Sequence, residues 1–63
     1  MITISTAERI KHIRNLTAMT QAKFSDVYKI PKRTLEDWER GINKPPEYVV
    51  NLLEKLIVYE LQL

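Results

Sequence analysis

The chain has 63 residues, the length of one small domain, and 44% of them are hydrophobic, which is enough for a single core. It contains no cysteine, so it forms neither a disulfide nor a cysteine-based zinc site, and its one histidine is too few for a metal site. The net charge of +2 combines +4 over residues 1–44 (nine Lys/Arg, five Asp/Glu) with −2 over residues 45–63 (one Lys/Arg, three Asp/Glu), so the first part suits a polyanionic partner.

The first five residues alternate between apolar and polar side chains, a pattern that suits a short extended arm. This arm is either a frayed end or a segment whose Ile2 and Ile4 contact a partner subunit. It is too short for a signal peptide and lacks the basic leader of one, and no apolar run is long enough to span a membrane. We therefore expect a cytoplasmic protein.

A first helix is predicted to begin at Ser5, because Ser5 and Glu8 have the spacing of a capping box, in which each side chain bonds to the other residue's backbone N–H. Apolar residues then recur at helical spacing and form the stripe that we expect to be buried, namely Ala7, Ile10 and Ile13, with Leu16 as a further candidate.

The stretch from Thr20 to Gly41 predicts two short helices separated by a tight break. Thr20 can cap the first helix, Pro31 can start the second, and Gly41 can end it in a left-handed conformation. Leu35 and Trp38 are expected to point inward, which leaves the charged residues around them on the outside. This arrangement is a helix-turn-helix.

A last helix is predicted over about residues 46–61, after a stiff loop that contains Pro45 and Pro46. It is apolar on more than one stripe, whereas a monomer of this size has one core. We therefore expect a homodimer with this helix as its interface, through Val50, Leu53, Ile57, Val58 and Leu61. The alternative is that the helix is central and is held between the first and third helices.

The sequence offers no enzymatic centre. Ser5 and Ser25 have no plausible histidine partner, and the adjacent Glu36 and Asp37 project about 100° apart on a helix, too far to act as a carboxylate pair. A single glycine excludes a glycine-rich phosphate loop. No catalytic residue, cofactor or metal is therefore expected.

Several positions in matching register resemble the phage-repressor (lambda-repressor-like, Xre) family of helix-turn-helix DNA-binding domains. They are Gln21-Ala22, Ser25, Ile30, Leu35, Trp38-Glu39 and Gly41. The resemblance extends from about Ala7 to about Leu56 and implies one all-α domain over residues 1–63, a compact bundle of four to five short helices. Lys29 departs from the family, which usually has glycine at this turn position, and a left-handed lysine costs roughly 1 kcal/mol.

The resemblance implies that a recognition helix from Pro31 to Arg40 enters the major groove of double-stranded DNA by its N-terminal end. The residues expected to reach base edges are Lys32, Arg33, Glu36 and Asp37. Those expected to contact phosphates are Thr20, Gln21, Thr34 and Lys44. Arginine can bond guanine O6 and N7, and a carboxylate can accept from cytosine N4. Arg14 and Glu39 match a pair that commonly forms a structural ion pair in this family.

We therefore expect a sequence-specific transcriptional regulator, a dimeric repressor whose two recognition helices lie about 34 Å apart. An activator with this domain would look no different. The main alternative is an antitoxin that binds a toxin protein and regulates its own expression. A domain that only mediates oligomerisation is disfavoured, because Lys32 and Arg33 occupy the positions of base readers.

Overall fold

Four α-helices follow one another along residues 4–62, the part of the chain that this computed structural model describes. They are α1 (Thr6–Thr17), α2 (Gln21–Tyr28), α3 (Lys32–Arg40) and α4 (Glu47–Leu61). No strand occurs among these residues. The all-α prediction is confirmed, and α2 and α3 form the expected helix-turn-helix, joined by residues 29–31.

Short polar side chains begin the first two helices as the sequence predicts. The Ser5 hydroxyl accepts a hydrogen bond from the Glu8 backbone N–H, and the Thr20 hydroxyl accepts one from the Lys23 N–H, both at 3.2 Å. Pro31 and Pro46 lie at the N-cap positions of α3 and α4. Helix α3 therefore begins at Lys32, one residue later than the expected start at Pro31. Because proline has no N–H, it leaves no donor unsatisfied there.

Three helices end at residues with left-handed backbone, with φ values of 60° at Ala18, 57° at Lys29 and 76° at Gly41. Gly41 was expected to adopt this conformation, and for Lys29 only its cost was given. Ala18 was not expected to adopt it, because alanine carries no signal for it. Lys29 therefore takes the left-handed conformation at the turn although it has a Cβ atom.

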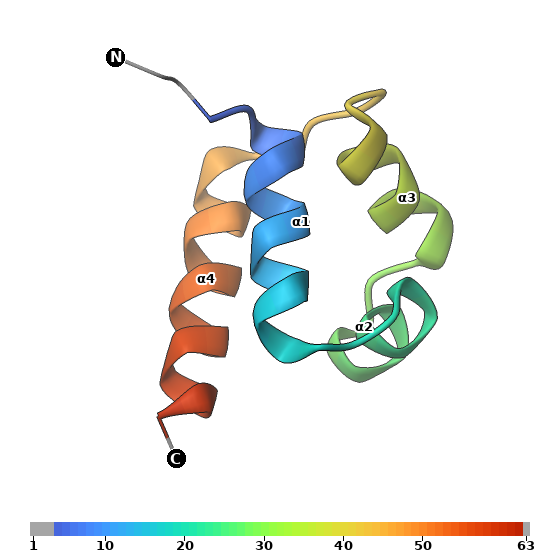
Figure 1. The fold of residues 1–63 in the computed structure, drawn as a ribbon. Helices are drawn as coiled ribbons and strands as arrows, with labels where there is room; N and C mark the ends of the chain where they lie inside the picture. Colours follow the sequence, from blue (N-terminus) through green and yellow to red (C-terminus); the bar gives the residue numbers. More distant parts are fainter. Residues whose placement is uncertain (1–3, 63) are drawn as a thin grey trace.

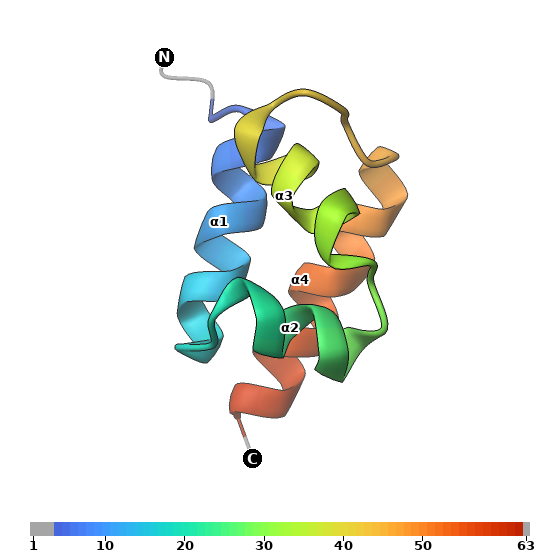
Figure 2. The same ribbon diagram turned by 90° about the vertical axis from the view of Figure 1, so that its right-hand side faces the viewer.

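Helix α1 contacts both α3 and α4, and α2 contacts α3. Figure 1 shows α4 on one side of α1 and the α2–α3 unit on the other. Seen from that second side, α2 and α3 lie in front of α4 (Figure 2). The Tyr28 hydroxyl donates to the Glu60 carboxylate at 2.8 Å and links α2 to α4. The outward sides of α3 and α4 therefore face away from each other.

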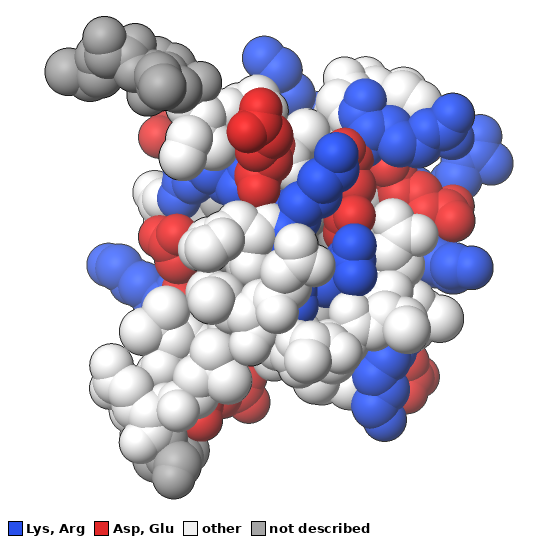
Figure 3. Space-filling view, viewed as in Figure 1, with Lys and Arg blue, Asp and Glu red and all other residues white. Residues whose placement is uncertain are grey.

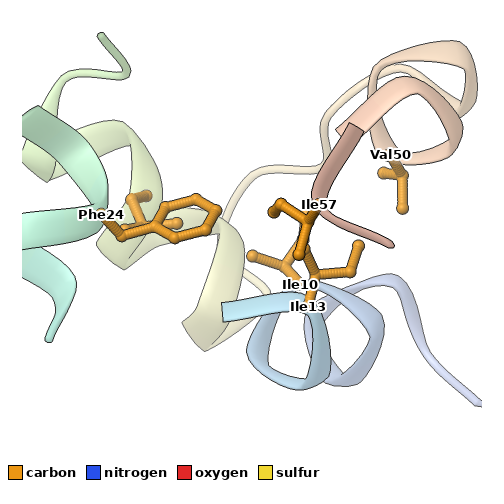
Figure 4. Close-up of a cluster of buried hydrophobic side chains, with 6 residues drawn as sticks. Ile10, Ile13, Phe24, Val50 and Ile57 are labelled. Carbon is orange, nitrogen blue, oxygen red and sulfur yellow. The ribbon is translucent and has the colours of Figure 1, made fainter. Parts of the chain in front are cut away.

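All four helices contribute to one apolar core (Figure 4). Its fully buried members are Ile10, Ile13, Phe24, Leu35, Val50 and Ile57. Met19, Tyr28, Ile30, Trp38 and Leu53 pack against it.

Three of the predicted interface residues belong to this core. Val50 and Ile57 are each 1% exposed, and Leu53 packs against the cluster, so these three are corrected to core positions. The physical reason is that α1 needs an apolar partner on its α4 side. Val58 and Leu61 remain exposed, as does Leu16, which was a candidate for the buried stripe.

The beginning of the chain leaves one expectation open. Ile2 lies outside the described residues, whereas Ile4 is exposed. Over residues 4–62, no helix has the length and apolar character needed to cross a membrane.

Candidate nucleic-acid interface

The inward side of α3 is held by a buried ion pair between Arg14 of α1 and Glu39. Two parallel hydrogen bonds join them, from Arg14 Nε to Glu39 Oε2 at 2.7 Å and from Nη2 to Oε1 at 3.0 Å. Arg14 Nη1 also donates to the Met19 carbonyl at 3.0 Å, and the Gln21 amide donates to Glu39 Oε1 at 3.2 Å. Glu39 is only 4% exposed, so this network keeps a buried carboxylate fully partnered.

This network fixes the position of α3 relative to α1 and α2. The hydrogen bond to Glu39 raises the pKa of Arg14, against an opposing effect of burial, and the charge of Glu39 raises it further. The Glu39 partner therefore favours the charged form of the guanidinium. The ion pair implied by the family resemblance is present, and it acts as a brace behind the outward side.

The outward side of α3 carries charged residues that remain accessible. Arg33 has 86% of its side chain exposed and Lys32 more than half, and both lie in the first turn. Lys32 Nζ lies 4.0 Å from Glu36 Oε2, and Arg33 Nε lies 3.6 Å from Asp37 Oδ1. These distances are longer than those of strong hydrogen bonds, so both cations keep N–H donors available to a ligand.

Other residues predicted to bind DNA differ in how free they are. The Gln21 side-chain amide donates its hydrogen bond to Glu39. The Asp37 side chain is only 16% exposed, and its carboxylate lies close to Arg33 and Asn43. Thr20 and Lys44 are exposed, whereas Thr34 is half-buried. The Thr20 hydroxyl oxygen accepts the capping hydrogen bond from the Lys23 N–H, and its own O–H remains available to donate.

Arg40 is a functional candidate that the sequence reasoning missed. It is exposed and lies seven residues after Arg33, which places both arginines on one side of α3. That spacing was the available signal. In Figure 3 the blue side chains of lysine and arginine are most numerous on the right, over α3 and the loop after it, with acidic side chains among them.

The outward side of α4 has a different chemistry. Four apolar or aromatic side chains lie along it at helical spacing, each between 45% and 67% exposed, namely Tyr48, Leu52, Leu56 and Tyr59. Lys55 is the charged residue among them. We call this set of five residues the outer α4 face. Figure 3 shows largely uncharged surface toward the C-terminal end of α4, at the lower left.

Comparisons with protein-family models, with curated proteins and with solved structures found no match to this chain.

Proposed function

We propose that the protein is a sequence-specific double-stranded DNA-binding regulator of transcription, which inserts the N-terminal end of α3 into the major groove. The observation that carries the proposal is the pair of exposed cations, Lys32 and Arg33, in the first turn of a helix braced from behind by Arg14 and Glu39. A helix held in this way presents its side chains at a fixed angle, which readout of base edges requires.

The chemistry of these two side chains suits base edges. Arginine has a planar fork of N–H donors that matches O6 and N7 of guanine, and lysine donates to the same atoms. Both lie where α3 is free of neighbouring helices, since α1 and α2 cover its other side. Arg40 extends the cationic side toward the end of the helix.

Phosphate contacts would set the register of the helix on the duplex. The exposed Thr20 hydroxyl and the Lys44 ammonium flank α3 from the start of α2 and from the loop after α3. Hydroxyls and ammonium groups are common donors to phosphate, and such contacts position a protein without reading sequence. Gln21 is a weaker phosphate candidate than the sequence suggests, because Glu39 engages its amide.

The outer α4 face supports a homodimer as the form of the protein that binds DNA. Four such side chains, about half to two-thirds exposed, amount to roughly 500 Å² per chain and 1,000 Å² for a pair, the lower limit of a specific interface. The core does not need them, because Val50, Leu53 and Ile57 already supply its α4 side.

The order of these side chains favours a second copy over an unrelated protein. They read Tyr, Leu, Leu, Tyr from either end, at spacings of four, four and three residues. An antiparallel pairing about a two-fold axis therefore brings Leu52 beside Leu56 of the second copy, and Tyr48 beside its Tyr59. A two-fold interface must be self-complementary in this sense.

The test is selection of bound duplexes from a random-sequence pool at about 150 mM salt, which suppresses non-specific attraction. We expect an enriched palindrome whose half-sites are one helical turn apart. Enrichment of a single half-site would retain DNA recognition and reject the dimer. Absence of any enrichment with folded protein would reject the proposal and favour the antitoxin alternative, in which a toxin protein covers the outer α4 face.

A further inference from the structure

Asp37 is the residue of α3 with the most protein partners on the outward side. Its Oδ1 lies 3.6 Å from Arg33 Nε, and its Oδ2 accepts a hydrogen bond from the Asn43 side-chain amide at 3.3 Å. Its backbone carbonyl accepts from the Ile42 N–H at 3.0 Å. The side chain is only 16% exposed. The carboxylate is therefore held by the loop after α3 and faces Arg33.

The contact with Asp37 leaves the two Nη atoms of Arg33 free to bind a ligand. A guanidinium has five N–H donors, one on Nε and four on the two Nη atoms. Asp37 approaches the Nε side, and 86% of the Arg33 side chain is exposed, so the Nη pair is accessible to a ligand. Two parallel N–H groups are what a bidentate contact with guanine requires.

The neighbouring pair lacks this support. Lys32 Nζ and Glu36 Oε2 are 4.0 Å apart, and within residues 4–62 the Glu36 carboxylate receives no hydrogen bond from another element. Lysine is also a point charge on a flexible stem, so a carboxylate beside it fixes no orientation. The two pairs have the same i, i+4 spacing, but only Asp37 is anchored.

We propose that Asp37, anchored by Asn43, is a positioning residue that determines the specificity of Arg33. It holds the Nε side so that the Nη pair presents to a base edge. Its negative charge also opposes the approach of Arg33 to a phosphate, because a phosphate oxygen would lie near the Asp37 carboxylate. The inference rests on the proposed DNA-binding function and names how its base reader is oriented.

The consequence is a trade between specificity and general affinity. In a specific complex Arg33 keeps Asp37 on one side and guanine on the other. In a non-specific complex Arg33 must turn toward a phosphate and leave Asp37. Asp37 thus weakens binding to random DNA more than binding to the selected site.

The experiment compares Asp37→Asn, Asn43→Ala and the wild-type chain on the duplex enriched from the random pool and on a scrambled duplex of the same length. Asp26→Asn is the matched control, because it removes the same charge from a carboxylate in α2 that lies 4.0 Å from Lys29. Affinities are measured at several salt concentrations, since a change that is only electrostatic follows the salt dependence of phosphate binding.

We expect Asp37→Asn to lower the ratio of specific to non-specific affinity about tenfold, a part of the roughly 5- to 150-fold that one bidentate contact supplies. Asn43→Ala, which changes no charge, should lower the ratio in the same direction by about threefold. Asp26→Asn should strengthen both affinities alike and leave the ratio unchanged. Equal ratios for Asp37→Asn and Asp26→Asn would overturn the proposal.

A measurement without DNA separates this inference from the proposed function. Nitrogen relaxation of the arginine Nε–Hε groups by NMR should show a more restricted Arg33 than Arg40, which has no ion pair within residues 4–62. The restriction should disappear in Asp37→Asn and weaken in Asn43→Ala. Equal mobility of Arg33 in all three proteins would reject the positioning role even if the wild-type chain selects DNA. A restricted Arg33 in a chain that selects no DNA would instead reject the function alone.

Discussion

The ion pairs on the two sides of α3 have the same chemistry and different consequences. Inside the bundle, Arg14 and Glu39 meet at 2.7 and 3.0 Å with every carboxylate oxygen partnered. Outside, Lys32 and Arg33 lie 4.0 and 3.6 Å from their carboxylates, and both cations are mostly exposed. A buried pair must be complete because desolvation is costly, whereas a pair with an exposed cation adds little stability and leaves the cation's other N–H donors free for a ligand.

The largest effect should come from breaking the inside pair. Glu39→Ala leaves the Arg14 guanidinium, which is 19% exposed, without its carboxylate, so we expect a loss of about 3 kcal/mol in the free energy of unfolding, the lower end for a broken buried pair. A domain of this size has little more than that in reserve. The measurement is chemical or thermal denaturation followed by circular dichroism.

Glu36→Ala is the matched control, because it breaks an exposed pair on the same helix. Its effect on stability should stay within about 0.5 kcal/mol. Similar losses for both variants would show that burial does not distinguish the two pairs.

The helix ends and the ion pair behind α3 could be predicted before the structure was known. Ser5, Thr20 and Gly41 mark helix ends through local chemistry, and these signals do not depend on the rest of the fold. The Arg14–Glu39 ion pair was predicted from the family resemblance.

The errors arose where one helix has apolar residues on two sides. Periodicity along α4 cannot say which stripe faces α1, so Val50 and Ile57 were assigned to an interface that they cannot reach. The Asn43 contact with Asp37 was likewise beyond prediction, since it depends on how the loop folds back.

The outer α4 face is the second exterior region to test. Leu52→Asp places a charge at the centre of the proposed interface, so we expect self-association to weaken at least thirtyfold, about 2 kcal/mol, because the apolar contact is lost and the carboxylate must give up its water there. Sedimentation velocity over a range of concentrations measures it. A point substitution is sharper than truncation of α4, which would also remove Ile57 from the core.

Ile42→Asp provides the matched control for this test. Ile42 is exposed to about the same extent as Leu52 but lies in the loop between α3 and α4. Its variant should associate like the wild-type chain. Equal self-association of the two variants would rule out the outer α4 face as the interface.

Arg33→Ala tests the outward side of α3. We expect a loss of about 1–3 kcal/mol on the selected duplex and relaxed preference at one base pair, with stability unchanged because the side chain is exposed. Electrophoretic mobility shifts on variants of the selected duplex measure this. Lys11→Ala removes an exposed positive charge from α1 and is the control. If Arg33→Ala weakens binding to selected and scrambled duplexes equally, the residue contacts phosphate only.

Tyr28 links the interior to the exterior and should make stability depend on alkaline pH. Burial, and then the hydrogen bond to Glu60, raise the pKa of Tyr28 in the folded protein above its ordinary value of 10.0. The unfolded chain therefore loses the proton first. Stability should be complete below about pH 10 and fall as the pH rises through the folded-state pKa. Tyr28→Phe should cost about 1 kcal/mol at neutral pH and remove this part of the alkaline loss, as measured by denaturation at a series of pH values.

Ser25 is the exception to the rule that polar groups inside the bundle are partnered. Its side chain is buried, and within residues 4–62 its hydroxyl oxygen has no hydrogen-bond partner. The position needs a small residue because the side chain is buried, 7% exposed, beside the tight turn in which the Ser25 carbonyl accepts from the Ile30 N–H at 3.0 Å. Ser25→Ala keeps the size and removes the hydroxyl, so we expect a gain of about 0.5–1 kcal/mol in the free energy of unfolding. A loss of that size would instead mean that a water molecule satisfies the hydroxyl, and the interior would then follow the rule without exception.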